Sequence, residues 1–131
     1  MIRRTEIILY VEDQRASAGF YRALLRGDPV LDVPGMTEFR LSEGVKLGLM
    51  PSAGVARLLG PAVPDPGLGQ GIPRCELYLI VDDAAAEFDH ATGVGATPVS
   101  PPRLRDWGDR AAYVSDPDCH IVAFAETPAA N

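Results

Sequence analysis

The chain has 131 residues and a formal net charge of −6, and its lysine and arginine residues form no cluster. Nucleic acid is therefore disfavoured as a partner, because phosphate recognition needs a concentrated cationic face. The apolar run at positions 7–11 is too short for a signal peptide or a membrane span, so we expect a cytoplasmic protein with no membrane partner. The two cysteines, Cys75 and Cys119, make neither a disulfide framework nor a metal-binding pair, and we interpret them as free thiols.

The first half of the chain predicts a strand, a helix and three further strands. The strand covers residues 5–11, and the helix runs from an Asp13 cap to about Arg26, with Gly27 as its stop signal. Strand patterns follow at 30–33, 37–41 and 45–49, separated by turn residues.

The second half repeats this order. Residues 51–73 are rich in proline and glycine, which predicts a linker with at most a short turn at 55–59. A strand at 75–81, a helix at 83–92 and strands at 97–100, 110–115 and 121–126 then follow. Val11 and Val81 end the two opening strands 70 positions apart, and acidic residues and a helical pattern follow each. We therefore predict one α+β domain, residues 1–131, made of two tandem βαβββ modules at 4–50 and 74–126.

Three groups of segments carry a family resemblance. They are Val11-Glu-Asp13 with Phe20-Tyr-Arg-Ala-Leu-Leu25, Val81-Asp82, and Trp107-Gly-Asp-Arg110 with Tyr113-Val-Ser-Asp116-Pro-Asp118 and Ile121-Val-Ala-Phe124. Over residues 4–126 the chain resembles the vicinal oxygen chelate superfamily, which includes glyoxalase I, extradiol dioxygenases and bleomycin-binding proteins. The resemblance implies a glyoxalase-like fold whose two modules form a cupped mixed sheet around a small organic ligand, and a homodimer.

The resemblance also implies where a divalent metal would bind. The ligand positions of the family's enzymes map to Glu6, Gly48, Glu76 and Ala123, of which Gly48 and Ala123 have no donor atom. Two carboxylates without imidazole or thiolate are a poor site for zinc, nickel or iron. We expect no cofactor; a divalent metal, if one binds, would use Glu6 and Glu76.

The same two glutamates are the candidate catalytic residues. Strand alternation places Glu6 with Tyr10 on one face and Glu76 with Tyr78 on the matching face. If both glutamates face one pocket, repulsion and desolvation would raise at least one pKa, which suits a general base. The alternative, in which each lies near water or pairs with an arginine, stays open. The candidate ligand-pocket residues are Tyr10, Arg40, Gly48, Tyr78, Ala123 and Trp107, the last in a loop with Pro101, Pro102 and Gly108.

Three functions are consistent with this pattern. The first is a small-molecule-binding protein of the glyoxalase/bleomycin-resistance type with a degenerate metal site, which sequesters an organic compound such as an antibiotic. The second is a metal-dependent lyase or isomerase resembling glyoxalase I (lactoylglutathione lyase). An extradiol dioxygenase is disfavoured, because His90 and His120 are expected on opposite sides of a sheet. The third is an interaction domain that has lost its pocket. Whether the protein is an enzyme stays open.

Overall fold

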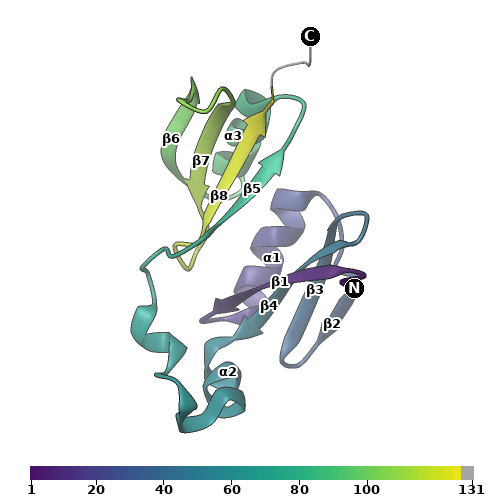
Figure 1. Cartoon of the computed structure of the whole chain (residues 1–131), viewed down its shortest axis with the longest axis vertical. Coiled ribbons are helices and arrows are strands. Elements are labelled where there is room, and N and C mark those ends of the chain that lie inside the picture. The colour runs from purple at the N-terminus through teal and green to yellow at the C-terminus, as the bar shows by residue number, and fades with distance from the viewer. Residues whose placement is uncertain (128–131) are drawn as a thin grey trace. The chain divides into compact units, whose positions relative to one another are not determined.

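The computed structural model describes residues 1–127, and the chain divides into two compact units, Met1–Gln70 and Gly71–Asn131. Each unit contains its own four-stranded mixed sheet with a helix across one face (Figure 1). The predicted α+β class and the two tandem βαβββ modules are confirmed. Within residues 1–127, no helix has the length and apolar character that crossing a membrane requires.

The first unit follows the predicted order. Its elements are β1 (Thr5–Val11), α1 (Gln14–Leu25), β2 (Leu31–Val33), β3 (Met36–Ser42) and β4 (Val45–Pro51). The strands lie in the order β1-β4-β3-β2; β1 and β4 are parallel, and the other neighbours are antiparallel. This order makes β1 an edge strand of its sheet.

Helix α1 begins as predicted and ends one residue early. Asp13 is the N-cap, and its Oδ1 accepts a hydrogen bond from the Ala16 N–H at 3.0 Å. The expected stop at Gly27 is wrong by one position, because Arg26 already has the left-handed conformation, with φ of 56°. The N–H groups of Arg26 and Gly27 both donate to the Arg22 carbonyl, which closes the last turn without glycine at the cap.

The core of the first unit lies between α1 and one face of the sheet. Alternate residues of the central strands are buried there, and the helix contributes Tyr21 and Leu24. The predicted packing of the Leu47 and Leu49 face against the helix is confirmed. The buried apolar residues of this layer are Leu9, Val11, Ala18, Phe20, Tyr21, Leu24, Phe39, Leu47 and Leu49.

The linker contains more structure than expected. We predicted at most a short turn, whereas the segment forms α2 (Ser52–Leu59) and two short 3₁₀ turns, η1 (Gly60–Ala62) and η2 (Pro66–Gly69). The prediction failed because the prolines flank the helix at positions 51 and 61 and do not interrupt it. Val55, which is 1% exposed, anchors α2 in the first unit.

The second unit repeats the architecture. Its elements are β5 (Glu76–Ile80), α3 (Ala84–Gly93), β6 (Thr97–Leu104), β7 (Arg110–Ser115) and β8 (Ile121–Glu126). The strands lie in the order β5-β8-β7-β6, and β5 and β8 are parallel. The buried apolar residues between α3 and its sheet include Leu77, Ala91, Ala112, Val114, Val122 and Phe124.

Strand β6 is longer than predicted. We expected it to end at residue 100 and placed Pro101 and Pro102 in the following loop, but both prolines lie within the strand. β6 is at the edge of its sheet, where one side of the strand needs no N–H donors. Proline is tolerated there for that reason.

Candidate functional site

Strand register defines the open face of the first sheet, which is the face opposite α1. Residues directly opposite one another in a sheet point to the same side, and β1 pairs Glu6 with Lys46 and Ile8 with Gly48. β3 pairs Glu38 with Gly48 from the other side of β4. The open face of the first unit therefore carries Glu6, Ile8, Tyr10, Met36, Glu38, Arg40, Lys46, Gly48 and Met50.

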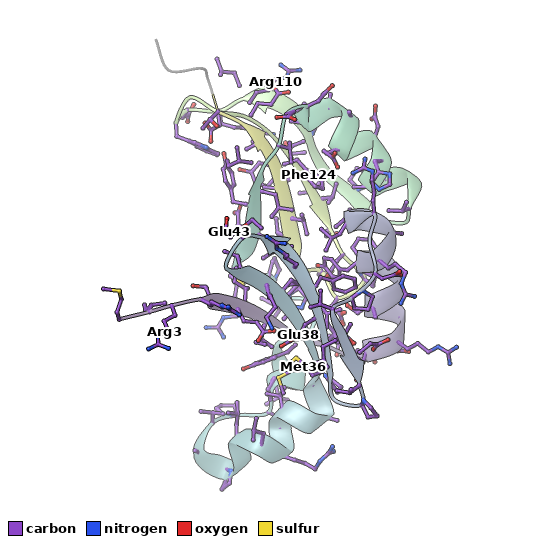
Figure 2. The ribbon with its side chains drawn as sticks, turned by 90° about the vertical axis from the view of Figure 1, so that its right-hand side faces the viewer. Arg3, Met36, Glu38, Glu43, Arg110 and Phe124 are labelled. Carbon is purple, nitrogen blue, oxygen red and sulfur yellow. The ribbon has the colours of Figure 1, made fainter. Side chains whose placement is uncertain are left out.

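Two carboxyl groups and one ammonium group meet on this face. Lys46 Nζ donates to Glu38 Oε1 at 2.8 Å, and the Glu38 and Glu6 side chains are hydrogen-bonded to each other. Figure 2 shows Glu38 beside Met36 along β3. We call Glu6, Glu38 and Lys46 the carboxyl cluster. It comes from three adjacent strands of one sheet.

The carboxyl cluster separates the pKa values of its two acids. The hydrogen bond with Glu38, followed by burial, raises the pKa of Glu6. The same hydrogen bond, together with the one from Lys46, lowers the pKa of Glu38. The two shifts have opposite directions, so Glu6 binds a proton more readily than Glu38 does. Of the alternatives left open for Glu6, the one in which it lies near water agrees with its exposure, and its hydrogen-bond partner is Glu38 and not an arginine.

Gly48 lets the side chain of Ile8 lie across β4. A Cβ atom at position 48 would be 2.6 Å from Ile8 Cδ1, 3.1 Å from Glu6 Oε1 and 3.3 Å from Met36 Sδ. The space beside Gly48 is thus filled by neighbouring side chains of the first unit. A larger residue there would have to displace Ile8.

Tyr10 and Arg40 lie on the same face but outside the carboxyl cluster. Tyr10 is 40% exposed, and Arg40 is exposed and lies opposite Lys46 across the β3–β4 pair. Within residues 1–127, Arg40 makes no ion pair. Its guanidinium group therefore faces solvent with its donors available.

The open face of the second sheet is built differently. Register places Ala123 between Tyr78 on β5 and Tyr113 on β7, and Glu76 lies opposite Ile121. Ala123 is completely buried, as are Ala111 and Ala125 on the same face. Short alanine side chains leave room for the flanking aromatic rings to cover the sheet.

A hydrogen-bonded group joins two of the predicted residues. The Tyr78 hydroxyl donates to Asp109 Oδ2 at 2.6 Å and accepts from Trp107 Nε1 at 2.8 Å. Asp109 is only 8% exposed, whereas Trp107 is 59% exposed. Burial, followed by the hydrogen bond to Asp109, raises the pKa of Tyr78. Tyr78 therefore stays protonated. Its hydroxyl fixes the side chain of Trp107, which belongs to the loop that follows β6.

Arg105 begins this loop and covers Tyr113. Its guanidinium carbon lies 5.0 Å from the centre of the Tyr113 ring, which is cation–π distance. Burial, and then the charge of Glu76, raise the pKa of Tyr113. Glu76 itself is exposed at the start of β5. The open face of the second unit thus combines Tyr78, Trp107, Asp109, Arg105, Tyr113 and Glu76, which we call the aromatic cluster.

Two other features lie outside these clusters. A shallow groove in the first unit lies between α1 and β2, lined by residues such as Arg15, Arg22 and Asp32. In the part of the chain that the structure describes, no three His, Cys, Asp or Glu side chains gather at one point. His90 lies in α3, and His120 follows the turn after β7.

Comparison with known proteins identifies the family to which this architecture belongs. A family model described as "Glyoxalase-like domain" matches residues 6–123. The chain belongs to this family. It is therefore a member of the vicinal oxygen chelate superfamily, as its sequence segments indicated. No curated protein sequence shows significant similarity to it.

Solved structures share the glyoxalase-like fold. A glyoxalase-related enzyme from Fulvimarina pelagi is 25% identical with a TM-score of 0.80, over 94% of this chain and 86% of that one. A protein from Agrobacterium tumefaciens is 28% identical with a TM-score of 0.77, over 98% and 100% of the two chains. A glyoxalase/bleomycin resistance protein/dioxygenase family enzyme from Burkholderia phytofirmans is 15% identical with a TM-score of 0.78, over 94% and 97%. At that identity the last likeness concerns the fold alone.

Sequence reasoning missed several members of both clusters in this glyoxalase-like protein. Glu38 and Lys46 were detectable, because each alternates with a residue already assigned to the open face, Arg40 and Gly48 respectively. Asp109 was harder to detect. Its only signal was its place in the Trp-Gly-Asp segment that carried the family resemblance.

Proposed function

We propose that this glyoxalase-like protein binds a small organic molecule on the open faces of its sheets and acts by sequestration, without a working metal centre. The observation that carries the proposal is the carboxyl cluster. At the position where family enzymes would supply a metal ligand, Glu6 is hydrogen-bonded to Glu38, and Lys46 lies 2.8 Å from Glu38.

A divalent metal does not fit these donors. Metal binding needs ionised carboxylates, but the hydrogen bond with Glu38 raises the pKa of Glu6 and so opposes its ionisation. The ammonium group of Lys46 would also repel a cation. Gly48 supplies no donor atom, and Ile8, Glu6 and Met36 surround the place where its side chain would begin. The donor chemistry therefore supports a degenerate metal site.

The composition of the open faces supports an organic ligand. Ligand sites combine apolar and aromatic surface with a few polar groups. The first unit offers Ile8, Met36 and Met50 beside the carboxyl cluster, and the second offers Tyr78 and Trp107 with fixed hydrogen bonds. The shared fold does not decide the activity, since it occurs in proteins named as enzymes and as resistance proteins.

Metal analysis and a ligand screen test the proposal together. Protein purified without chelators is dialysed in turn against zinc, nickel, manganese and iron, and metal content is measured for the wild type, Glu6→Ala/Glu76→Ala and the control Glu43→Ala. We expect no stoichiometric metal in any of them, and we expect small aromatic or antibiotic compounds to raise the melting temperature. Near-stoichiometric metal that is lost only in the double variant would overturn the proposal.

A second candidate function is a lyase or isomerase related to glyoxalase I, in which Glu6 transfers a proton. The raised pKa of Glu6 favours it, because a general acid or base works best with a pKa near the working pH. Turnover of α-oxoaldehyde adducts of thiols by the wild type, lost in Glu6→Gln and retained in Glu43→Gln, would establish this activity in place of sequestration.

The proposal also includes a cytoplasmic homodimer. Apolar side chains are exposed on the edge strands of both sheets, with Ile7 at 37% exposure on β1 and Ile80 at 58% on β5. Exposed apolar strand edges are normally covered by a partner. Sedimentation equilibrium would show a dimer, and a monomer at tens of micromolar concentration would refute this part.

A further inference from the structure

Arg105 is a half-buried cation without a carboxylate partner. Its Nε and Nη2 atoms donate to neutral oxygens only: the Ala111 carbonyl at 3.1 and 2.8 Å, Ser100 Oγ at 2.9 Å and the Pro101 carbonyl at 2.9 Å. Within residues 1–127, no Asp or Glu lies within ion-pair distance of it. Partly buried charges are usually paired. The counterion of Arg105 is therefore to be sought outside the chain.

The geometry leaves one edge of the guanidinium group available. Nη1 makes no hydrogen bond in the described part of the chain. The four hydrogen bonds and the Tyr113 ring hold the group in a fixed orientation. A guanidinium group held in this way is suited to bind an oxyanion, because less side-chain entropy is lost on binding than for a mobile arginine.

Aromatic surface lies next to this cation. The loop that begins at Arg105 closes on itself, since the Arg105 N–H donates to the Asp109 carbonyl at 2.8 Å. The Tyr78 hydroxyl donates a hydrogen bond to Asp109 Oδ2 and accepts one from Trp107 Nε1. Tyr78 and Tyr113 lie two strands apart across β8, roughly 10 Å. Aromatic surface and the free edge of Arg105 are thus within the span of one small molecule.

We propose that the aromatic cluster binds a flat aromatic compound bearing one carboxylate, with the ring against Trp107 and Tyr78 and the carboxylate on Arg105. This deepens the proposed function by naming a ligand class and assigns Arg105 as the residue that selects it. Asp109 is a positioning residue, because it fixes both aromatic side chains through the Tyr78 hydroxyl. Glu76 and Asp109 also bring negative charge to this region. Glu76 is exposed, so water and salt screen its repulsion, and Asp109 accepts the hydrogen bond of the Tyr78 hydroxyl.

Three probe compounds separate the contributions of ring and charge. Isothermal titration calorimetry of the wild type compares 2-naphthoate, its neutral amide 2-naphthamide and the non-aromatic cyclohexanecarboxylate. A charge-assisted hydrogen bond predicts that the naphthoate binds roughly 10- to 100-fold more tightly than the amide. The cyclohexane acid should bind more weakly than the naphthoate, because it lacks a face for stacking. Trp107, the sole tryptophan, reports ring contact through its fluorescence.

Two arginine variants test the assigned residue. Arg105→Gln should remove the preference for the acid over the amide, whereas Arg110→Gln, an exposed cation at the start of β7 (Figure 2), should keep it. Circular dichroism and melting temperature establish that each variant is folded. If Arg105→Gln does not fold, Arg105→Lys is used; it keeps the charge but loses the planar fork, so the preference should fall.

The outcomes distinguish failure of the ligand assignment from failure of the proposed function. Equal binding of naphthoate and naphthamide to the wild type, or a preference that survives in Arg105→Gln, overturns the ligand assignment. If none of the three probes binds but other compounds raise the melting temperature, the assignment fails and the proposed function stands. If no compound binds in either experiment, both fail.

Discussion

In each unit, three residues lie side by side on neighbouring strands at equivalent positions of the open face, and their side chains differ between the two units. In the first unit, Ile8 lies opposite Gly48, with Glu38 on the next strand. In the second unit, Tyr78 lies opposite Ala123, and Tyr113 is on the next strand. An identical strand order thus supports a carboxyl cluster in one unit and a layer of tyrosines over alanine in the other. Topology fixes where the positions lie, and the side chains fix the chemistry.

The two clusters also differ in how far water reaches their polar groups. Asp109 in the aromatic cluster is 8% exposed, and its partner is a phenol at 2.6 Å. In the carboxyl cluster, Glu6 is exposed, and the side chains of Lys46 and Glu38 are 41% and 13% exposed. Polar interactions sheltered from water contribute more to stability than exposed ones. Glu38 is nearly as sheltered as Asp109, but its partners Glu6 and Lys46 are open to water, so loss of Asp109 should destabilise the protein more than loss of Glu38.

Replacing the acid of each cluster tests this difference and should have the largest effect. Asp109→Ala leaves the Tyr78 hydroxyl without its acceptor and loosens Trp107, so we expect a loss of about 2 kcal/mol in unfolding free energy. Glu38→Ala should cost less than about 1 kcal/mol. Urea denaturation followed by circular dichroism measures both. Equal losses would mean that the exposure of the partners of Glu38 to water does not weaken its interactions.

The close approach of Ile8 to Gly48 on the neighbouring strand offers a second test. Gly48→Ala should cost about 1 kcal/mol, because the new Cβ would lie 2.6 Å from Ile8 Cδ1. Ile8→Val removes that Cδ1 atom. In the double variant the alanine should therefore be close to neutral, giving a coupling energy of about 1 kcal/mol in a double-mutant cycle. Strict additivity of the two changes would show that Ile8 does not restrict position 48.

Much of the fold was accessible from sequence, for identifiable reasons. Short apolar segments bounded by turn residues predicted β1, β7 and β8 to the residue, and the 70-residue offset predicted the repeat. α2 was missed, because proline and glycine content was read over the whole linker, while the helix occupies the stretch between Pro51 and Pro61. Composition averaged over a long segment conceals a short helix.

The sites were less accessible, because their contacts are distant in sequence. Tyr78 and Asp109 are 31 positions apart, and they meet through a loop whose path periodicity does not encode. Glu6 and Glu38 meet because β4 lies between β1 and β3. That contact could have been predicted from the strand order of the fold. The prediction did not pair them, because it compared Glu6 with its repeat equivalent, Glu76.

Ser17 provides a test in the helical layer. Its Oγ atom is buried and has no hydrogen-bond partner within residues 1–127, although α1 packs closely there. Ser17→Ala should raise the unfolding free energy by about 1 kcal/mol, since it removes an unsatisfied hydroxyl and improves helix propensity. Ser52→Ala, at the start of α2, is the control and should change stability by less. Destabilisation by Ser17→Ala would indicate a partner, such as buried water.

The pH dependence of the carboxyl cluster should be the smallest effect, and its sign is the informative part. The pKa of Glu6 is raised above its ordinary value of 4.5, so its stabilising contribution is complete below pH 4.5 and is lost as pH rises through its folded-state pKa. The pKa of Glu38 is lowered, so its contribution is present above pH 4.5 and is lost as pH falls through its folded-state pKa. At pH 7, Glu6→Gln should therefore stabilise and Glu38→Gln should destabilise, each by less than about 1 kcal/mol.

Both differences should disappear when the comparison with the wild type is repeated at acid pH, where the two carboxyls are protonated in the folded and unfolded states alike. Glu43→Gln, in the exposed turn between β3 and β4, should show no such trend. Opposite signs for Glu6→Gln and Glu38→Gln would agree with the opposite pKa shifts, which two identical isolated carboxylates would not show. Shifts of the same sign would contradict the opposite directions of the two pKa shifts, and the distinction between the two acids would be lost.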